Sequence, residues 1–155
     1  MVTDMEMVNA TRRRALLDDF RRFHRCAGPG KLDEADELDR LYTEDIEFRD
    51  PVHTLHGRLA LRRYLRSLYD GCERIEFEYQ EELLTDHMAS IVWDMQLRHP
   101  RLRGGQAIEV RGMTLIRFTD RIFYQEDVYD LGSMLYQHIP VLGRVIRHIK
   151  RRLAA

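Results

Sequence analysis

The hydrophobic period of this chain changes at Gly71, and that change limits the folds that the chain can adopt. Before Gly71, apolar residues recur every three or four positions, as they do on one face of a helix. After it, apolar and polar residues alternate through four segments, as they do in half-buried strands. The four segments are residues 75–80, 91–98, 108–118 and 122–130. Their short connections predict an antiparallel sheet.

Amphipathic helices are predicted before and after these strands in the sequence. Three precede it, over residues 11–26, 32–42 and 58–69, with a short strand at 46–49 between the second and the third. A fourth apolar run after residue 133 is interrupted at Pro140 and Gly143. Helices followed by an antiparallel sheet indicate the α+β class. Gly112, inside the third long strand, predicts a bulge or bend that curls the sheet into a cone with one pocket.

Composition excludes several function classes. The chain has 155 residues, 44% of them hydrophobic, which suits one domain with one core. A net charge of −1 provides no overall attraction for nucleic acid. Two cysteines without a paired spacing predict neither a disulfide framework nor a zinc site, and they suit a reducing compartment. Because no signal peptide or membrane-spanning run is recognisable, we expect a soluble, cytoplasmic protein.

Asp50 is the first candidate for chemistry, because it ends a predicted strand directly before Pro51. The proline ring favours an extended conformation at Asp50, which fixes the direction of its carboxylate. That carboxylate could act as a general base, or it could accept local backbone N–H groups in a turn. His53 could be its polar partner or a proton carrier, or an ordinary surface histidine. His53 and His56 lack the spacing of a metal site, so no metal is expected.

The last strand carries three further acids, Glu126, Asp127 and Asp130. Alternation allows only one of Glu126 and Asp127 to face the cone. Odd-numbered residues, from Phe123 to Tyr129, would share the side of Asp127, and even-numbered residues that of Glu126. An inward acid would meet Asp50, and two nearby carboxylates would raise the pKa of one of them. The alternative is that these acids pair with arginines on the outer face.

The order of these motifs resembles the nuclear transport factor 2-like superfamily, and its SnoaL-like branch in particular. The resemblance rests on Tyr-x-x-Asp-x-x-Phe-x-Asp-Pro at residues 42–51, on Gly57, and on the strand segments 110–118 and 126–130. It covers about residues 11–132. It implies an α+β fold in which N-terminal helices cap a cone-shaped, strongly curved antiparallel sheet of the cystatin-like kind, followed here by a C-terminal amphipathic helix.

Members of this superfamily include ketosteroid isomerases, polyketide cyclases, limonene epoxide hydrolases, dehydratases and transport factors, so the fold does not settle the function. Asp50 falls where the isomerases keep the Asp that shuttles a proton. Their oxyanion hole uses a Tyr on the first helix and a protonated Asp on the third long strand. Here those positions correspond to Phe20 or Phe23 and to Thr114. The missing donors argue against steroid isomerisation by that mechanism.

We therefore expect a SnoaL-like protein that binds a small hydrophobic molecule in its cone without a cofactor. It would be an isomerase-like or cyclase-like enzyme with Asp50 as general base, assisted by Asp127 and His53. The residues expected to contact the ligand are Tyr42, Tyr64, Trp93, Glu126 and Tyr129. The alternative is a module that binds a ligand without chemistry or assembles as a homodimer.

Three regions are expected along the chain: a flexible N-terminus at 1–10, the SnoaL-like domain at 11–132 and a C-terminal helical extension at 133–155. The last of these would dock on its own sheet or on a second subunit, and we expect a homodimer. Binding to a membrane surface is not favoured, because basic residues alone would not suffice without an exposed apolar stripe.

Overall fold

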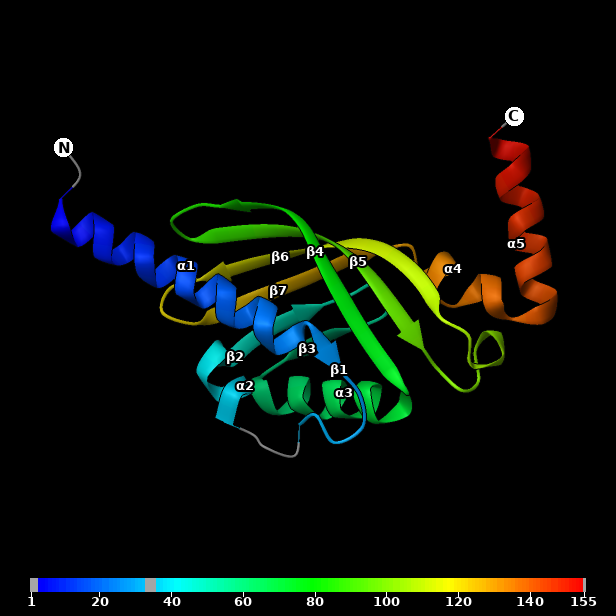
Figure 1. Cartoon of the computed structure of the whole chain (residues 1–155), viewed down its shortest axis with the longest axis horizontal. Helices are drawn as coiled ribbons and strands as arrows, with labels where there is room; N and C mark the ends of the chain where they lie inside the picture. Colours follow the sequence, from blue (N-terminus) through cyan, green and yellow to red (C-terminus); the bar gives the residue numbers. More distant parts are fainter. Residues whose placement is uncertain (1–2, 33–35, 155) are drawn as a thin grey trace.

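The structure is a computed structural model that describes residues 3–32 and 36–154 (Figure 1). The first half contains α1 (Asp4–His24), β1 (Cys26–Ala27), α2 (Asp36–Leu41), β2 (Tyr42–Arg49), β3 (Thr54–His56) and α3 (Arg58–Gly71). The second half contains β4 (Arg74–Leu84), β5 (Met88–Arg98), η1 (Arg103–Gly105), β6 (Ile108–Phe118), β7 (Ile122–Tyr129), α4 (Leu131–Met134), η2 (Tyr136–His138) and α5 (Pro140–Leu153).

One curled sheet of seven strands, in the order β1-β4-β5-β6-β7-β2-β3, forms the body of the molecule. Strands β4, β5, β6 and β7 pair with one another in antiparallel fashion, which confirms the predicted α+β fold and its antiparallel sheet. Strand β2 pairs with β7 in parallel, which the sequence did not predict. Because Arg49 lies beside Glu126 in that pairing, the residue after β2 is placed next to the second half of β7. Asp50 and Asp127 therefore lie near each other, where the end of β2 meets β7.

A β-bulge in β7 sets which of its side chains face inward. Phe118 pairs with Ile122 and Arg117 with Tyr124, so Phe123 is the extra residue. Its side chain is exposed, and the expectation that it shares the inner side with Asp127 is wrong. Ile122 and Gln125 are both buried. The period-2 alternation holds only beyond the bulge.

Gly112 makes room for an aromatic ring and does not mark a bulge. It pairs directly with Trp93 on β5, and the register of β5 and β6 is unbroken there. A Cβ atom at Gly112 would overlap the indole ring of Trp93. The predicted bulge at this glycine is therefore wrong, and the sheet is irregular instead in β4, between Tyr79 and Glu82, and in β7.

Replacing Gly112 with Ala should destabilise the protein by about 1–3 kcal/mol, the usual cost of overpacking. Trp93 would have to move, and its Nε1–H would lose its hydrogen bond to Thr114 Oγ1, which is 2.9 Å long. Urea denaturation followed by the fluorescence of this single tryptophan measures the effect. The control is Gly71→Ala, where the added methyl group meets nothing closer than 4.0 Å. Equal midpoints for the two variants would contradict this account of Gly112.

The helices differ from their predicted bounds for local reasons. Helix α1 begins at Asp4, before the predicted Thr11, because Thr3 and Glu6 form a capping box. Residues 4–10 are thus helical, where a flexible N-terminus was expected. The helix ends at His24, and after the C-cap Arg25 the residues Cys26 and Ala27 pair with β4. The predicted start of the second helix falls partly on residues 33–35, outside the described residues.

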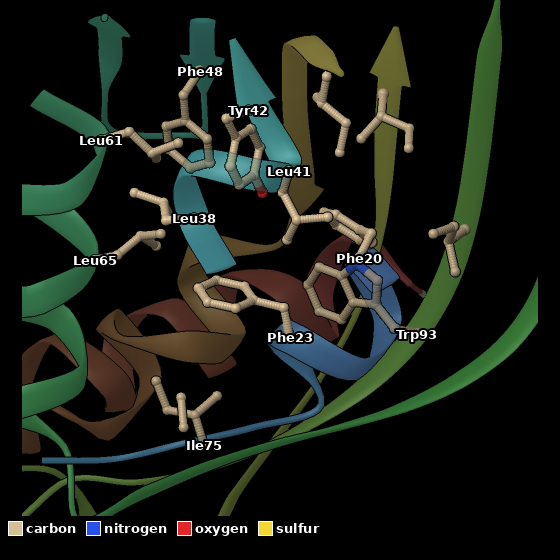
Figure 2. Close-up of a cluster of buried hydrophobic side chains, with 14 of the residues drawn as sticks. Phe20, Phe23, Leu38, Leu41, Tyr42, Phe48, Leu61, Leu65, Ile75 and Trp93 are labelled. Carbon is tan, nitrogen blue, oxygen red and sulfur yellow. The ribbon is translucent and has the colours of Figure 1, made fainter. Parts of the chain in front are cut away.

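The three N-terminal helices cover one side of the curled sheet, and the core lies between the two layers (Figure 1). Figure 2 shows side chains from each layer meeting there: Phe20 and Phe23 come from α1, Leu61 and Leu65 from α3, and Trp93 from β5. All five are buried. The interior of the cone is thus filled mainly by apolar and aromatic side chains, and a narrow cavity remains among them.

Candidate functional site

The cavity inside the cone has a volume of about 90 Å³. Its wall is mostly apolar and aromatic, with four polar side chains, those of His24, Asp50, Gln125 and Asp127, besides the tyrosines. The volume is well below the roughly 300–1,000 Å³ of sites for drug-sized ligands, but it exceeds the roughly 10–15 Å³ that one water requires. In this conformation the cavity suits a small molecule.

Asp50 lines the cavity and is also held by its own loop, so both interpretations of it from the sequence are partly realised. Its Oδ1 accepts hydrogen bonds from the backbone N–H groups of Val52, at 2.8 Å, and His53, at 2.6 Å. Tyr64, on α3, donates its O–H to the other oxygen at 2.5 Å. The side chain is only 2% exposed. Most of the lone pairs of Asp50 are therefore occupied by the chain itself.

His53 supports this carboxylate from outside the cavity. Its Nδ1 lies 3.2 Å from Asp50 Oδ1, and its ring packs on Tyr64 with the ring centroids 4.7 Å apart. The side chain is 42% exposed, and it is not part of the cavity wall. The sequence thus placed His53 correctly beside Asp50, and its role as a proton carrier stays a prediction.

Asp127 faces the cavity from β7 and has one oxygen available. Thr114 Oγ1 and Gln125 Nε2 both donate to its Oδ1, at 2.7 and 3.1 Å. No donor among the described residues reaches its Oδ2. Burial, with smaller effects of the charges of Asp50 and Glu126, raises the pKa of Asp127 to about 6 against the lowering effect of the two hydrogen bonds. A carboxylate with such a pKa changes its protonation state near neutral pH, as a general base or acid must.

A chain of buried hydrogen bonds leads from the helices to Asp127. An ionised carboxylate only accepts, so the amide nitrogen of Gln125 faces Asp127 and its Oε1 accepts from Tyr42 O–H at 2.6 Å. Because the hydroxyl proton of Tyr42 is used in that bond, the Tyr42 oxygen accepts from His24 Nε2–H at 2.7 Å. His24 Nδ1 then accepts from Tyr69 O–H at 3.1 Å. Every donor in the chain points toward Asp127, which stabilises its anion.

His24 is a residue of the site that the sequence patterns did not single out, although it follows Phe20 and Phe23 on the apolar face of α1 at helical spacing. The two phenylalanines were the positions of the first helix expected to face the site. Both rings instead pack on His24, with centroids 4.6 and 4.8 Å away. Burial, with a smaller effect of Lys31, lowers the pKa of His24 to about 3, so the imidazole is neutral.

The other residues predicted to contact a ligand lie in three kinds of place. Tyr64, Trp93 and Tyr129 form part of the cavity wall. Tyr42 is fully buried behind the wall, in the hydrogen-bond chain. Glu126 is outside the cavity wall, where it accepts the O–H of Tyr124 at 2.6 Å. Of the two adjacent acids, Asp127 is the one that faces the cavity.

Tyr129 is, besides Asp127, a second polar group of the wall that the chain leaves available. Within residues 3–32 and 36–154, no group hydrogen-bonds to its hydroxyl. Burial, and then the charges of Asp50 and Asp127, raise its pKa, so it stays a neutral phenol. The two carboxylates and this hydroxyl could contact one small molecule. No three His, Cys, Asp or Glu side chains of the described residues come together as a metal-binding group.

Comparison with known proteins agrees with this architecture. The family model of the SnoaL-like domain matches residues 14–124. No curated protein matches the chain in sequence. A structure described as a candidate SnoaL-like polyketide cyclase from Jannaschia sp. CCS1 is 15% identical, with a TM-score of 0.66 over 91% of this chain and 97% of the other.

Two further structures share the fold at similar distance. An epoxide hydrolase from M. tuberculosis, similar to limonene epoxide hydrolase (LEH-like), is 12% identical, with a TM-score of 0.64 over 88% of this chain and 96% of the other. A protein of unknown function from Burkholderia pseudomallei, similar to nuclear transport factor 2, is 14% identical, with a TM-score of 0.63 over 82% and 94%. At these identities the likeness establishes the fold alone.

Proposed function

The chain belongs to the SnoaL-like domain family, and on that basis we propose that it is a cofactor-independent enzyme that moves a proton on a small carbonyl compound, as an isomerase or cyclase does. Asp127 is the general base in this proposal, in place of the Asp50 favoured from the sequence. The single observation that carries the proposal is the buried carboxylate of Asp127, with a pKa of about 6 and a free Oδ2 beside an apolar cavity.

The contacts of the two acids support this exchange of roles. Asp50 accepts from two backbone N–H groups and from Tyr64, so a substrate proton would compete with bonds that the loop already makes. Asp127 receives its donors on one oxygen only. The negative charge of Asp50 also raises the pKa of Asp127, which makes Asp127 the stronger base. Asp50 is therefore a positioning residue, and its charge also raises the pKa of Asp127.

The reaction follows from these groups. Asp127 Oδ2 removes a proton from the carbon next to the substrate carbonyl, and the C–H electron pair moves into an enolate whose oxygen accepts from Tyr129 O–H. The protonated Asp127 then returns the proton to another carbon of the conjugated system. In a cyclisation the enolate carbon instead attacks a second carbonyl carbon of the same molecule, the electron pair of that C=O bond moves to its oxygen, and the resulting alkoxide takes the proton from Asp127. One neutral phenol stabilises the enolate less than a complete oxyanion hole would, so modest rates are expected.

The test is exchange of the α-protons of cyclopentanone for deuterium in D₂O, followed by NMR. We expect the purified protein to accelerate the exchange, with a rate that rises with pH through an inflection near 6 as Asp127 ionises. Asp127→Asn should lower the protein-dependent rate about a hundredfold, the usual contribution of a general base. Asp50→Asn should keep measurable exchange, with the inflection moved to lower pH because a negative charge is removed.

The matched control is Glu126→Gln, which changes the adjacent acid outside the cavity. The charge of Glu126 is the smallest of the causes that raise the pKa of Asp127, so the maximal rate should stay close to that of the wild type and the inflection should move only slightly to lower pH. Equal rates for the wild type and Asp127→Asn would contradict the assignment of the base. Exchange no faster than in buffer would instead favour the second candidate, a module that binds a ligand without chemistry. The narrow cavity and the occupied lone pairs of Asp50 favour that candidate. Assembly of such a module as a homodimer stays a prediction.

A further inference from the structure

Helix α5 presents an apolar stripe that its own chain leaves uncovered. Leu142, Val145, Ile149 and Leu153 recur at helical spacing, and their exposed fractions lie between 41% and 83%. Figure 1 shows α5 standing apart from the sheet, at the end of the molecule opposite the start of α1. The stripe is therefore not part of the core. Of the two expected arrangements, docking on the chain's own sheet is wrong, and docking on a second subunit stays a prediction.

Helix α5 contacts the rest of the chain through polar and small residues. Arg147 Nη1 donates to the backbone oxygen of Gln137 at 2.6 Å, and Lys150 Nζ forms an ion pair with Asp130 at 2.6 Å. Gly143 packs so closely on the same Gln137 oxygen that a Cβ atom would overlap it. These contacts fix one side of the helix on the segment before it. The apolar stripe lies on a different side and points away from them.

The rest of the helix surface is basic. Helix α5 has no Asp or Glu, and its charged and titratable residues are Arg144, Arg147, His148, Lys150, Arg151 and Arg152. Basic side chains thus occupy the helix surface outside the stripe. An apolar stripe on one side and cationic side chains around the rest are typical of helices that lie in the interface of an anionic bilayer. The long basic side chains can reach the headgroups while the stripe enters the acyl boundary.

We propose that α5 binds the surface of anionic lipid membranes, with its apolar stripe immersed and its arginines on the headgroups. Charge complementarity favours an anionic lipid surface over a second α5 helix. Two α5 helices paired through their stripes would bring two strongly basic helices together with no acidic residue of α5 to compensate them. In the described part of the chain, no helix is long and apolar enough to cross a bilayer, so α5 would lie on the surface.

The experiment is cosedimentation of the full chain with vesicles. Vesicles of phosphatidylcholine with about one third phosphatidylserine supply the anionic surface, and vesicles of phosphatidylcholine alone supply the neutral one. We expect at least about tenfold tighter binding to the anionic vesicles, weakened by added salt. Two variants separate the two contributions. Leu142→Gln with Ile149→Gln polarises the stripe, and Arg151→Glu with Arg152→Glu reverses flanking charge. Each pair should weaken binding about tenfold or more.

Matched controls make the same kinds of change elsewhere on the surface. Leu83→Gln alters an exposed leucine of β4, and Arg63→Glu reverses an exposed arginine of α3. Both should bind vesicles as the wild type does. Equal binding to the two kinds of vesicle, or full binding by the stripe variant, would overturn the proposal. So would a wild-type dimer, seen by sedimentation velocity, that the stripe variant converts to monomers, because the stripe would then join two copies of the chain.

Discussion

Asp127→Asn should make the folded protein more stable above pH 7, by about 3 kcal/mol. The pKa of Asp127 rises from an ordinary 3.8 to about 6 on folding, mainly through burial. At 1.36 kcal/mol for each pKa unit, an ionised Asp127 costs the folded state about 3 kcal/mol. Asparagine keeps an oxygen for Thr114 and Gln125 and carries no charge. The variant should therefore lose the proposed activity and gain stability.

The sign of the pH dependence follows from proton binding. Between pH 3.8 and about 6 the folded protein holds the Asp127 proton while the unfolded chain has released it, so stability falls as pH rises through this window. The stabilisation by Asp127→Asn should thus be complete above about pH 7 and absent near pH 3. Urea unfolding of both proteins at pH 3, 5 and 7.5 measures it, with the free energy of unfolding extrapolated to water at each pH.

Glu126→Gln is the control here as well, because it removes a neighbouring carboxylate that lies outside the cavity wall. Its effect should stay within about 0.5 kcal/mol at every pH. A gain for Asp127→Asn that is equal at pH 3 and pH 7.5 would show that charge burial is not its cause. A residue that lowers stability in this way suits a functional site better than a structural one, since strained or charged groups are retained there for chemistry.

The sequence was sufficient for the fold because the change of period, the order of elements and the Asp50-Pro51 corner are all local signals. It could not select between Glu126 and Asp127. The bulge at Phe123 offsets the alternation within the strand, and a bulge depends on the pairing with β6. It also did not predict that β2 runs parallel to β7, which brings Asp50 beside Asp127.

The hydrogen-bond chain behind Asp127 is a further limit of local patterns. It joins side chains from α1, α3, β2 and β7, and no spacing within the sequence links His24 to Gln125. The signal in the sequence for this chain of hydrogen bonds was His24, a histidine on an otherwise apolar helix face. Helix α5 shows the converse case. Its amphipathic pattern was plain in the sequence, but which side of it faces the chain depends on contacts at Gln137 and Asp130.

Protonation of His24 should destabilise the protein in acid, at a cost of about 5 kcal/mol. Burial lowers its pKa from 6.5 to about 3, so the unfolded chain binds a proton in this window and the folded protein does not. Stability from His24 is therefore fully present above pH 6.5 and is lost as pH falls toward 3. The range from 6.5 to about 3 corresponds to about 5 kcal/mol. Imidazolium also cannot accept the Tyr69 hydrogen bond.

Asp127 partly hides this loss in the wild type, because the two groups act with opposite sign between pH 3.8 and about 6. The clearest measurement is urea unfolding of Asp127→Asn from pH 7.5 to pH 4, where stability should fall by about 1.4 kcal/mol per pH unit below pH 6.5. Adding His24→Gln should lower stability at pH 7.5, since Tyr42 and Tyr69 lose a well-placed partner, and should flatten the dependence above pH 4. An unchanged slope in that double variant would show that another group controls acid unfolding. A flat profile would show instead that the buried, neutral His24 is the group that controls the loss of stability in acid.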